Sequence, residues 1–149
     1  APDRVLALVI LGGGSRLGVA PSILESTANE ATFPLAIKTI VDLSYGSQAS
    51  DRLKELATQR MQETRPTVLN GDFIACNEFN AREGLAEIKV STLILCGTED
   101  KMTPPKYSKQ LDEHIPNSEL ALIEGAGHMV MLEKPRDVAE VIERFVEKL

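Results

Sequence analysis

The chain contains only two cysteines, Cys76 and Cys96, among its 149 residues, and it has no tryptophan. Two cysteines are too few for a disulfide framework, and no cysteine and histidine residues have the spacing of a zinc site. We therefore expect no metal and no other cofactor. Because free thiols persist in reducing compartments, the cysteine content favours a cytoplasmic location.

Long apolar runs and clusters of basic residues are also missing. No apolar stretch approaches the roughly 20 residues needed to cross a bilayer, and residues 1–4 lack the charged-then-apolar order of a signal peptide. The formal net charge of −6 argues against binding to a phosphate backbone. The composition, 43% hydrophobic and 26% charged, predicts a globular domain that binds neither nucleic acid nor membranes.

Three apolar runs predict strands. Val5–Leu11 is continuously apolar and ends at three glycines, residues 12–14. Such a run is typical of a strand covered on both faces, as in a parallel sheet. Residues 89–96 and 120–123 repeat the pattern. The three glycines fit neither a dinucleotide-binding motif nor a Walker loop, so we interpret them as a flexible strand exit beside a cavity.

Helical periodicity replaces the strand signals between residues 19 and 88. We predict four short helices in this insertion, marked by Pro21, Pro34, Ser50 as an N-cap, and Pro66. Two more helices follow the second and third strands, the first with Thr103 as its N-cap and the second beginning at Pro135.

The order of these elements is strand, helical insertion, strand, helix, strand, helix. Alternation of this kind predicts an α/β fold with a short parallel sheet, right-handed crossovers and flanking helices. We divide the chain into a first core strand with its glycine turn (1–18), a cap-like helical insertion (19–88) and a C-terminal core (89–149).

Two polar residues follow the second and third predicted strands. Asp100 ends the turn that begins at Gly97, and His128 follows the Gly125–Gly127 turn. Because the carboxyl ends of parallel strands meet at one edge of a sheet, we expect Asp100 and His128 to be neighbours. An aspartate there can accept the Nδ1 proton of the histidine and leave Nε2 as a general base. Singly, Asp100 could only cap a turn and His128 could be a structural histidine, but together they favour catalysis.

The other histidine, His114, lies near the end of an amphipathic helix. We expect it only to interact with the C-terminal end of the helix dipole.

Three segments resemble the C-terminal part of the α/β-hydrolase superfamily: Thr92-Leu-Ile-Leu-Cys-Gly-Thr-Glu-Asp-Lys-Met-Thr-Pro104, Ile115-Pro-Asn-Ser-Glu-Leu120 and Ile123-Glu-Gly-Ala-Gly-His-Met-Val-Met-Leu-Glu-Lys-Pro135. Residues 2–11 resemble the sixth strand of that family and the loop before it. The insertion resembles, by position and helicity, the cap that many members carry between strands six and seven.

The resemblance implies a serine-type hydrolase that acts on a carboxylic ester or a related acyl bond. It assigns the acid of the catalytic triad to Asp100 and the base to His128, and it suggests that Met102, Met129 and Val130 line the substrate pocket. The alternative for these three apolar residues is an ordinary core position.

The family's nucleophile, on a Gly-x-Ser-x-Gly turn after the fifth strand, has no counterpart in the sequence. The segment Gly14-Ser-Arg-Leu-Gly18 has the wrong spacing and position, so Ser15 is a poor candidate. We therefore expect the C-terminal portion of a hydrolase, inactive alone. The alternatives are part of a dehalogenase or epoxide hydrolase with an aspartate nucleophile, or a non-catalytic binding or assembly module derived from a hydrolase.

The family's sheet order has a consequence for association. Without a fifth strand, Val5–Leu11 would be an open, apolar and uncharged edge, and such edges pair with other strands. We expect this chain to self-associate through that edge or to bind the missing N-terminal half.

Overall fold

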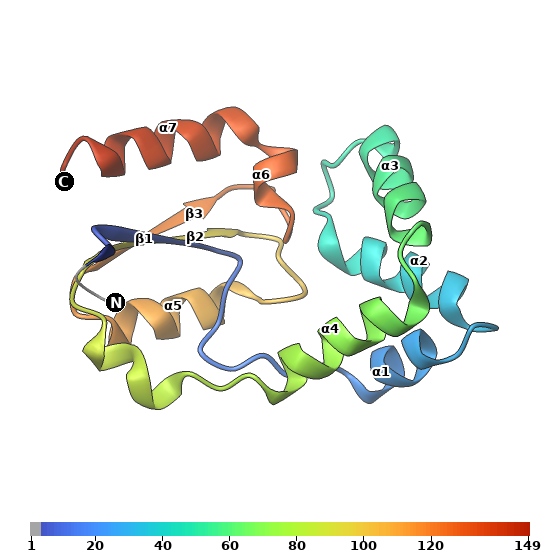
Figure 1. The fold of residues 1–149 in the computed structure, drawn as a ribbon. Helices are drawn as coiled ribbons and strands as arrows, with labels where there is room; N and C mark the ends of the chain where they lie inside the picture. Colours follow the sequence, from blue (N-terminus) through green and yellow to red (C-terminus); the bar gives the residue numbers. More distant parts are fainter. Residues whose placement is uncertain (1–3) are drawn as a thin grey trace.

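The computed structural model describes residues 4–149 of the chain. Its centre is one parallel sheet in the order β1 (Ala7–Leu11), β2 (Ser91–Gly97), β3 (Ser118–Ile123), as drawn in Figure 1. The predicted α/β class, a short parallel sheet with flanking helices, is confirmed. β1 begins two residues later than the predicted Val5, and residues 1–3 of the predicted first segment lie outside the described part of the chain.

The sheet is covered on both faces, which explains its continuous apolar runs. Side chains alternate along a strand, so Ile94 and Leu95 of the central strand β2 point to opposite faces. Ile94 packs with Leu111 and Ile115 around α5 (Pro105–His114). Leu95 packs on the other side with Val138 of α7 (Pro135–Val146). Figure 1 shows these two helices on opposite sides of the sheet.

Four helices lie between β1 and β2, in agreement with the helical periodicity. They are α1 (Pro21–Ala28), α2 (Phe33–Ser44), α3 (Asp51–Gln62) and α4 (Pro66–Glu78), and Figure 1 places them together beside the sheet. The predicted N-cap is present, since the Ser50 hydroxyl accepts a hydrogen bond from the N–H of Leu53 at 3.2 Å. The buried core of α2 consists of Phe33, Ile37, Val41 and the following Tyr45, and Leu53 of α3 and Leu69 of α4 pack against it.

Two short helices were not predicted: the 3-10 helix η2 (Arg82–Glu87) and α6 (Val130–Glu133). Four to six residues are too few for a hydrophobic period to emerge. The prediction that Thr103 caps α5 is wrong. The residue before α5 is Pro104, and the Thr103 hydroxyl instead donates to the carbonyl of Gly12. Among residues 4–149, no helix combines the length and apolar character needed to cross a bilayer.

The buried face of β2 generates a stability prediction. Leu95 is fully buried against Ile123, Val130 and Val138, so Leu95→Ala leaves a cavity and should lower the free energy of unfolding by about 2–5 kcal/mol. The matched control is Leu35→Ala on α2, where the side chain is 63% exposed and a change within about 0.5 kcal/mol is expected. Urea unfolding of both variants measures the difference, and equal losses would contradict this packing.

Candidate active site

The three strands end at the same edge of the sheet, and there the structure brings Asp100 and His128 together. The Nδ1 atom of His128 lies 2.9 Å from Oδ2 of Asp100. The Asp100 side chain is fully buried, whereas that of His128 is 25% exposed. The parallel register therefore produces the predicted juxtaposition of the acid and the imidazole.

The Asp100 carboxylate is held by hydrogen bonds on both oxygens. Its Oδ1 accepts from the N–H groups of Met102 at 2.9 Å and Thr103 at 2.8 Å. Its Oδ2 faces His128 Nδ1 and, at 2.9 Å, the Thr103 hydroxyl. A carboxylate can only accept, so the neutral imidazole carries its proton on Nδ1 and has the lone pair on Nε2. Such a nitrogen can take a proton from a hydroxyl or a water placed before it.

Gly12, directly after β1, packs against this pair. Its φ of +56° is in the left-handed region, which favours glycine. A Cβ atom at Gly12 would lie 3.0 Å from Nδ1 of His128 and 3.4 Å from Oδ2 of Asp100. A side chain there would have to displace the imidazole, so this strand exit depends on glycine.

The loop that carries His128 is fixed to the C-terminal end of α2. The Glu133 carboxylate accepts from the N–H of Gly46 at 2.8 Å and from the N–H of Gly127 at 3.0 Å. The N–H of Met129 donates to the carbonyl of Ser44 at 3.1 Å. The approach is close: a Cβ on Gly127 would lie 2.4 Å from the nitrogen of Gly46. The position of His128 is thus tied to the helical insertion.

A second carboxylate makes a similar link one residue before Asp100. Glu99 accepts from the N–H of Ser47 at 2.6 Å and from its hydroxyl at 2.8 Å. The bond from the Ser47 N–H, followed by the bond from its hydroxyl, holds the pKa of Glu99 below its usual value of about 4.5. Desolvation raises this pKa and the charge of Lys101 lowers it, but both effects are smaller than those of the two hydrogen bonds. Glu99 therefore remains ionised and bonded to Ser47 at neutral pH.

A pocket of about 290 Å³ opens beside His128. Its wall combines the loop after β1, the helical insertion and the Asp100 loop. Its lining includes Ile23, Leu43 and Phe73 from the insertion, and Met102 and Thr103 from the loop after Asp100. The pocket is mainly apolar, with the imidazole on one side, so it can hold an apolar group next to Nε2.

The three apolar residues suggested for the pocket have different positions. Met102 lines the pocket beside His128. Met129 packs on the core of the insertion around Tyr45, and Val130 is fully buried with Leu95 under the sheet. Val130 therefore has a core position, and Met129 is half-buried against the core of the insertion.

The remaining candidates have structural partners. Ser15 is buried, and its carbonyl accepts from the N–H of Ala81 at 2.7 Å. Nδ1 of His114 lies 2.7 Å from the carbonyl of Gln110 in the last turn of α5. Cys96 lies below Asp100, but burial raises the pKa of its thiol, which remains protonated and is a poor nucleophile. Among the described residues, no group of three or more histidine, cysteine, aspartate or glutamate side chains could hold a metal ion.

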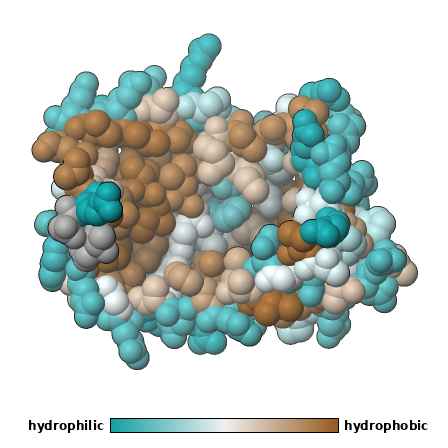
Figure 2. Space-filling model, viewed as in Figure 1, coloured by the Kyte–Doolittle hydropathy of each residue, from teal (hydrophilic) through white to brown (hydrophobic). Residues whose placement is uncertain are grey.

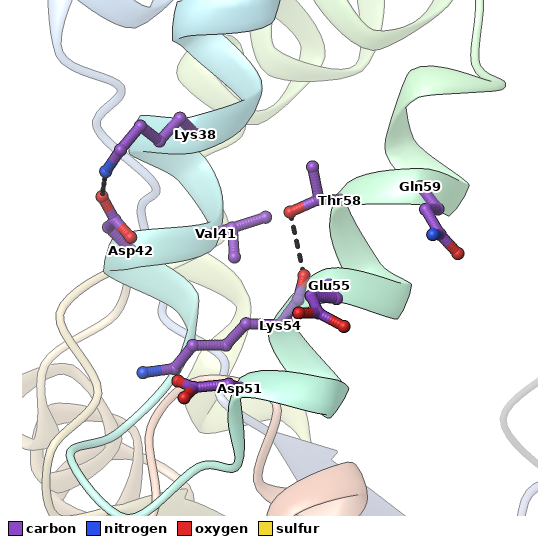
Figure 3. Close-up of a pocket in the computed structure, with 8 residues that line it drawn as sticks. All are labelled: Lys38, Val41, Asp42, Asp51, Lys54, Glu55, Thr58 and Gln59. Carbon is purple, nitrogen blue, oxygen red and sulfur yellow. Dashed lines mark hydrogen bonds and ion pairs between the residues drawn. The ribbon is translucent and has the colours of Figure 1, made fainter.

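A larger hollow of about 410 Å³ lies between α2 and α3, away from this pair (Figure 3). Charged side chains from both helices surround it, and Lys38 forms an ion pair with Asp42 within one turn of α2. The only apolar residue in its lining is Val41. It therefore has the character of a solvated groove between two surface helices.

Comparison with known proteins agrees with the fold. A sequence profile described as the alpha/beta hydrolase fold matches residues 1–135. The chain belongs to the α/β-hydrolase fold family.

Individual members of the family match over most of this chain. The solved structure of a thermophilic esterase is 38% identical, with a TM-score of 0.88, and the match covers 99% of this chain and 58% of that one. The AB hydrolase superfamily protein YisY of Bacillus subtilis is 32% identical over 72% of this chain and 41% of its own length. A pimeloyl-[acyl-carrier protein] methyl ester esterase of Neisseria meningitidis is 25% identical over 98% of this chain and 62% of its own. The chain thus spans about half the length of these relatives.

Several residues that hold the site escaped the sequence analysis. Thr103 has the sequence pattern of a helix cap, and no motif marks Glu99. Glu133 had no assigned partner, because its acceptor role depends on Gly46, 87 residues away. Gly12 was recognised only as a strand exit, and its contact with the imidazole depends on the register of all three strands.

The Glu99–Ser47 link generates a pH prediction. The folded-state pKa of Glu99 is lowered, so the stability that it contributes is fully present above its unfolded pKa of about 4.5 and is lost as the pH falls through the lower folded value. We expect Glu99→Gln to lower the melting temperature at pH 7 and the difference from the wild type to shrink towards pH 3. Thermal unfolding at a series of pH values measures it. The control is Glu143→Gln on α7. A difference in melting temperature between Glu99→Gln and the wild type that stayed constant with pH would contradict the link.

Proposed function

We propose that this chain is the C-terminal portion of a serine-type α/β hydrolase that cleaves a carboxylic ester or a related acyl bond. The contact that carries the proposal is the 2.9 Å approach of His128 Nδ1 to the buried Oδ2 of Asp100, beside an apolar pocket. The similarity to a thermophilic esterase at 38% identity supports the choice of esterase chemistry.

In this proposal, His128 is the general base. Its Nε2 takes the proton of a serine hydroxyl, whose oxygen attacks the acyl carbonyl, and the resulting imidazolium then protonates the departing alcohol. A water, deprotonated by the same nitrogen, releases the acid from the acyl-enzyme. Asp100 fixes the Nδ1–H tautomer and stabilises the imidazolium. The nucleophile and the oxyanion hole would come from the part of the hydrolase that this chain does not cover, so the chain alone is inactive.

The pocket supports an apolar acyl or alcohol group as the substrate moiety next to His128. Ile23, Leu43 and Phe73 of the insertion line it, together with Met102. This arrangement supports a cap function for the insertion, in which α1, α2 and α4 shape the substrate site. Because Glu133 and Glu99 bind the end of α2 to the loops of the site, the cap is held against the core beside His128.

The open side of β1 supports a polypeptide partner. Within residues 4–149, β1 pairs only with β2, and next to it Leu6 is 86% exposed. Figure 2 shows apolar side chains gathered over the area that β1 occupies in Figure 1. The partner that fits this edge is the remainder of a complete hydrolase, which would add a strand. A second copy of the chain would take its place when that remainder is absent.

A reducing, cytoplasmic environment is part of the same proposal. Both cysteines are free thiols, with Cys96 buried and Cys76 at the wall of the pocket. Such thiols persist where glutathione keeps cysteines reduced.

Catalysis can be tested in a chimera that joins this chain to the part of the thermophilic esterase that the match does not cover. We expect the chimera to hydrolyse p-nitrophenyl acetate. His128→Ala should lower kcat at least about a thousandfold, because the base is lost, and Asp100→Asn should lower it by about 10⁴, because the wrong tautomer is favoured. Steady-state kinetics measure both effects.

The control for the chimera is His114→Ala, which removes the other histidine and should leave kcat unchanged. A chimera that folds but is inactive, or one that keeps its kcat in His128→Ala, would overturn the proposed function. If the isolated chain hydrolyses the ester and His128→Ala abolishes this activity, the proposal that the chain is inactive by itself is wrong.

The partner proposal can be tested by sedimentation velocity. We expect the isolated chain to form dimers or larger species and to bind a dye specific for exposed apolar surface. Val9→Lys places a charge on the half-exposed edge strand and should shift the chain towards the monomer, whereas Leu35→Lys on α2 should not. A wild-type chain that sediments as a monomer with low dye binding would rule out this use of the edge.

A further inference from the structure

The Thr103 hydroxyl lies where the three strand exits meet. Its oxygen is 2.6 Å from the carbonyl of Gly12, 2.9 Å from Oδ2 of Asp100 and 3.1 Å from Nδ1 of His128. Thr103 is buried, with 8% of its surface exposed. One hydroxyl therefore contacts a residue after each of β1, β2 and β3.

The donors and acceptors at this point fit only a few arrangements. The hydroxyl has one proton, and the nearer of its two oxygen acceptors is the Gly12 carbonyl, at 2.6 Å against 2.9 Å for Oδ2 of Asp100. When the proton points to Gly12, a lone pair of the hydroxyl faces the Nδ1–H of His128. The imidazole proton is then shared between Oδ2 of Asp100 and the threonine oxygen.

Local backbone geometry explains why Thr103 reaches this place. Asp100 Oδ1 accepts from the N–H groups two and three residues later, a turn in which aspartate satisfies the following backbone. The turn carries Thr103 back over the carboxylate and sets its side chain beside Oδ2. The threonine N–H thus donates to Oδ1, and its hydroxyl oxygen lies 2.9 Å from Oδ2.

We propose that Thr103 is a positioning residue for the His128 imidazole, an inference that rests on the proposed function of His128 as general base. Two acceptors at Nδ1, in place of one, restrict rotation of the ring and so fix the direction of Nε2. The bond to the Gly12 carbonyl anchors the hydroxyl to the exit of β1. Loss of the hydroxyl loosens the ring without removing the acid or the base.

The isolated chain provides a test that requires no activity. The hydrogen-bonded Nδ1 proton of ¹⁵N-labelled His128 should give a low-field proton signal, identified by its absence in His128→Ala. In Thr103→Val, which keeps the shape but lacks the hydroxyl, we expect this proton to exchange with water on the order of tenfold faster or to become unobservable. Thr103→Ser should retain the signal. If the valine variant does not fold, Thr103→Ala is a second variant without the hydroxyl and should show the same loss.

A matched control separates positioning from general stability. Thr27 is also fully buried, and its hydroxyl donates at 2.7 Å to the carbonyl of Ile23, within α1. Thr27→Val removes an equivalent buried hydrogen bond but should leave the His128 signal unchanged. An unchanged Nδ1 signal and exchange rate in Thr103→Val, or the same change in Thr27→Val, would overturn the proposal.

The active chimera gives a second readout. Thr103→Val should lower kcat on the order of tenfold to a hundredfold, as expected for a misdirected base, while KM changes less than about threefold. Thr103→Ser should restore most of kcat. An effect on KM alone would contradict positioning. If the parent chimera is inactive, the proposed function fails, and the nuclear magnetic resonance comparison still decides the role of Thr103.

Discussion

The buried carboxylate of Asp100 is the group on which the arrangement of the site depends. An ionised carboxylate removed from water is costly unless hydrogen bonds replace its hydration, and here both oxygens are occupied. The two N–H groups on Oδ1 come from the next three residues and fix the turn after β2. Oδ2 accepts from Nδ1 of His128, and the Thr103 hydroxyl oxygen lies beside it. The contacts of Oδ1 are thus set by the local turn, whereas the contact of Oδ2 with His128 requires the register of the sheet.

The helical insertion belongs to the same network. Glu99 and Glu133, which flank the site in sequence, accept backbone hydrogen bonds from Ser47 and Gly46 at the end of α2. Glu133 also binds the N–H of Gly127, directly before His128. A movement of the end of α2 would therefore break bonds in the loop that carries the imidazole. The position of the insertion and the geometry of the pair are mechanically linked through two carboxylates.

The sequence predicted the parts of this structure that local patterns determine. The apolar runs around Ile94 and Leu120 and the glycine turns located the strands, and the strand order placed Asp100 beside His128. Contacts between distant segments could not be predicted in the same way. Thr103 has the residue type and position of a helix cap, and only the approach of Gly12, 91 residues away, redirects its hydroxyl. Met129 and Val130 follow the histidine, but their surroundings depend on the packing of α2 and α7.

The pair and the edge of the sheet are connected by geometry. The groups that orient His128, namely Asp100, Thr103 and Gly12, all belong to this chain, so the imidazole is held before any nucleophile is present. Gly12 directly follows β1, the strand with the open side. A strand that paired in parallel with β1 would end at the same edge, next to Gly12, since the carboxyl ends of parallel strands coincide. A residue on the turn after that strand would then meet an imidazole whose direction is already fixed, and such preorganisation is a main source of catalytic power. In the proposed hydrolase, the open edge is thus the side from which the nucleophile reaches His128 without any rearrangement of the pair.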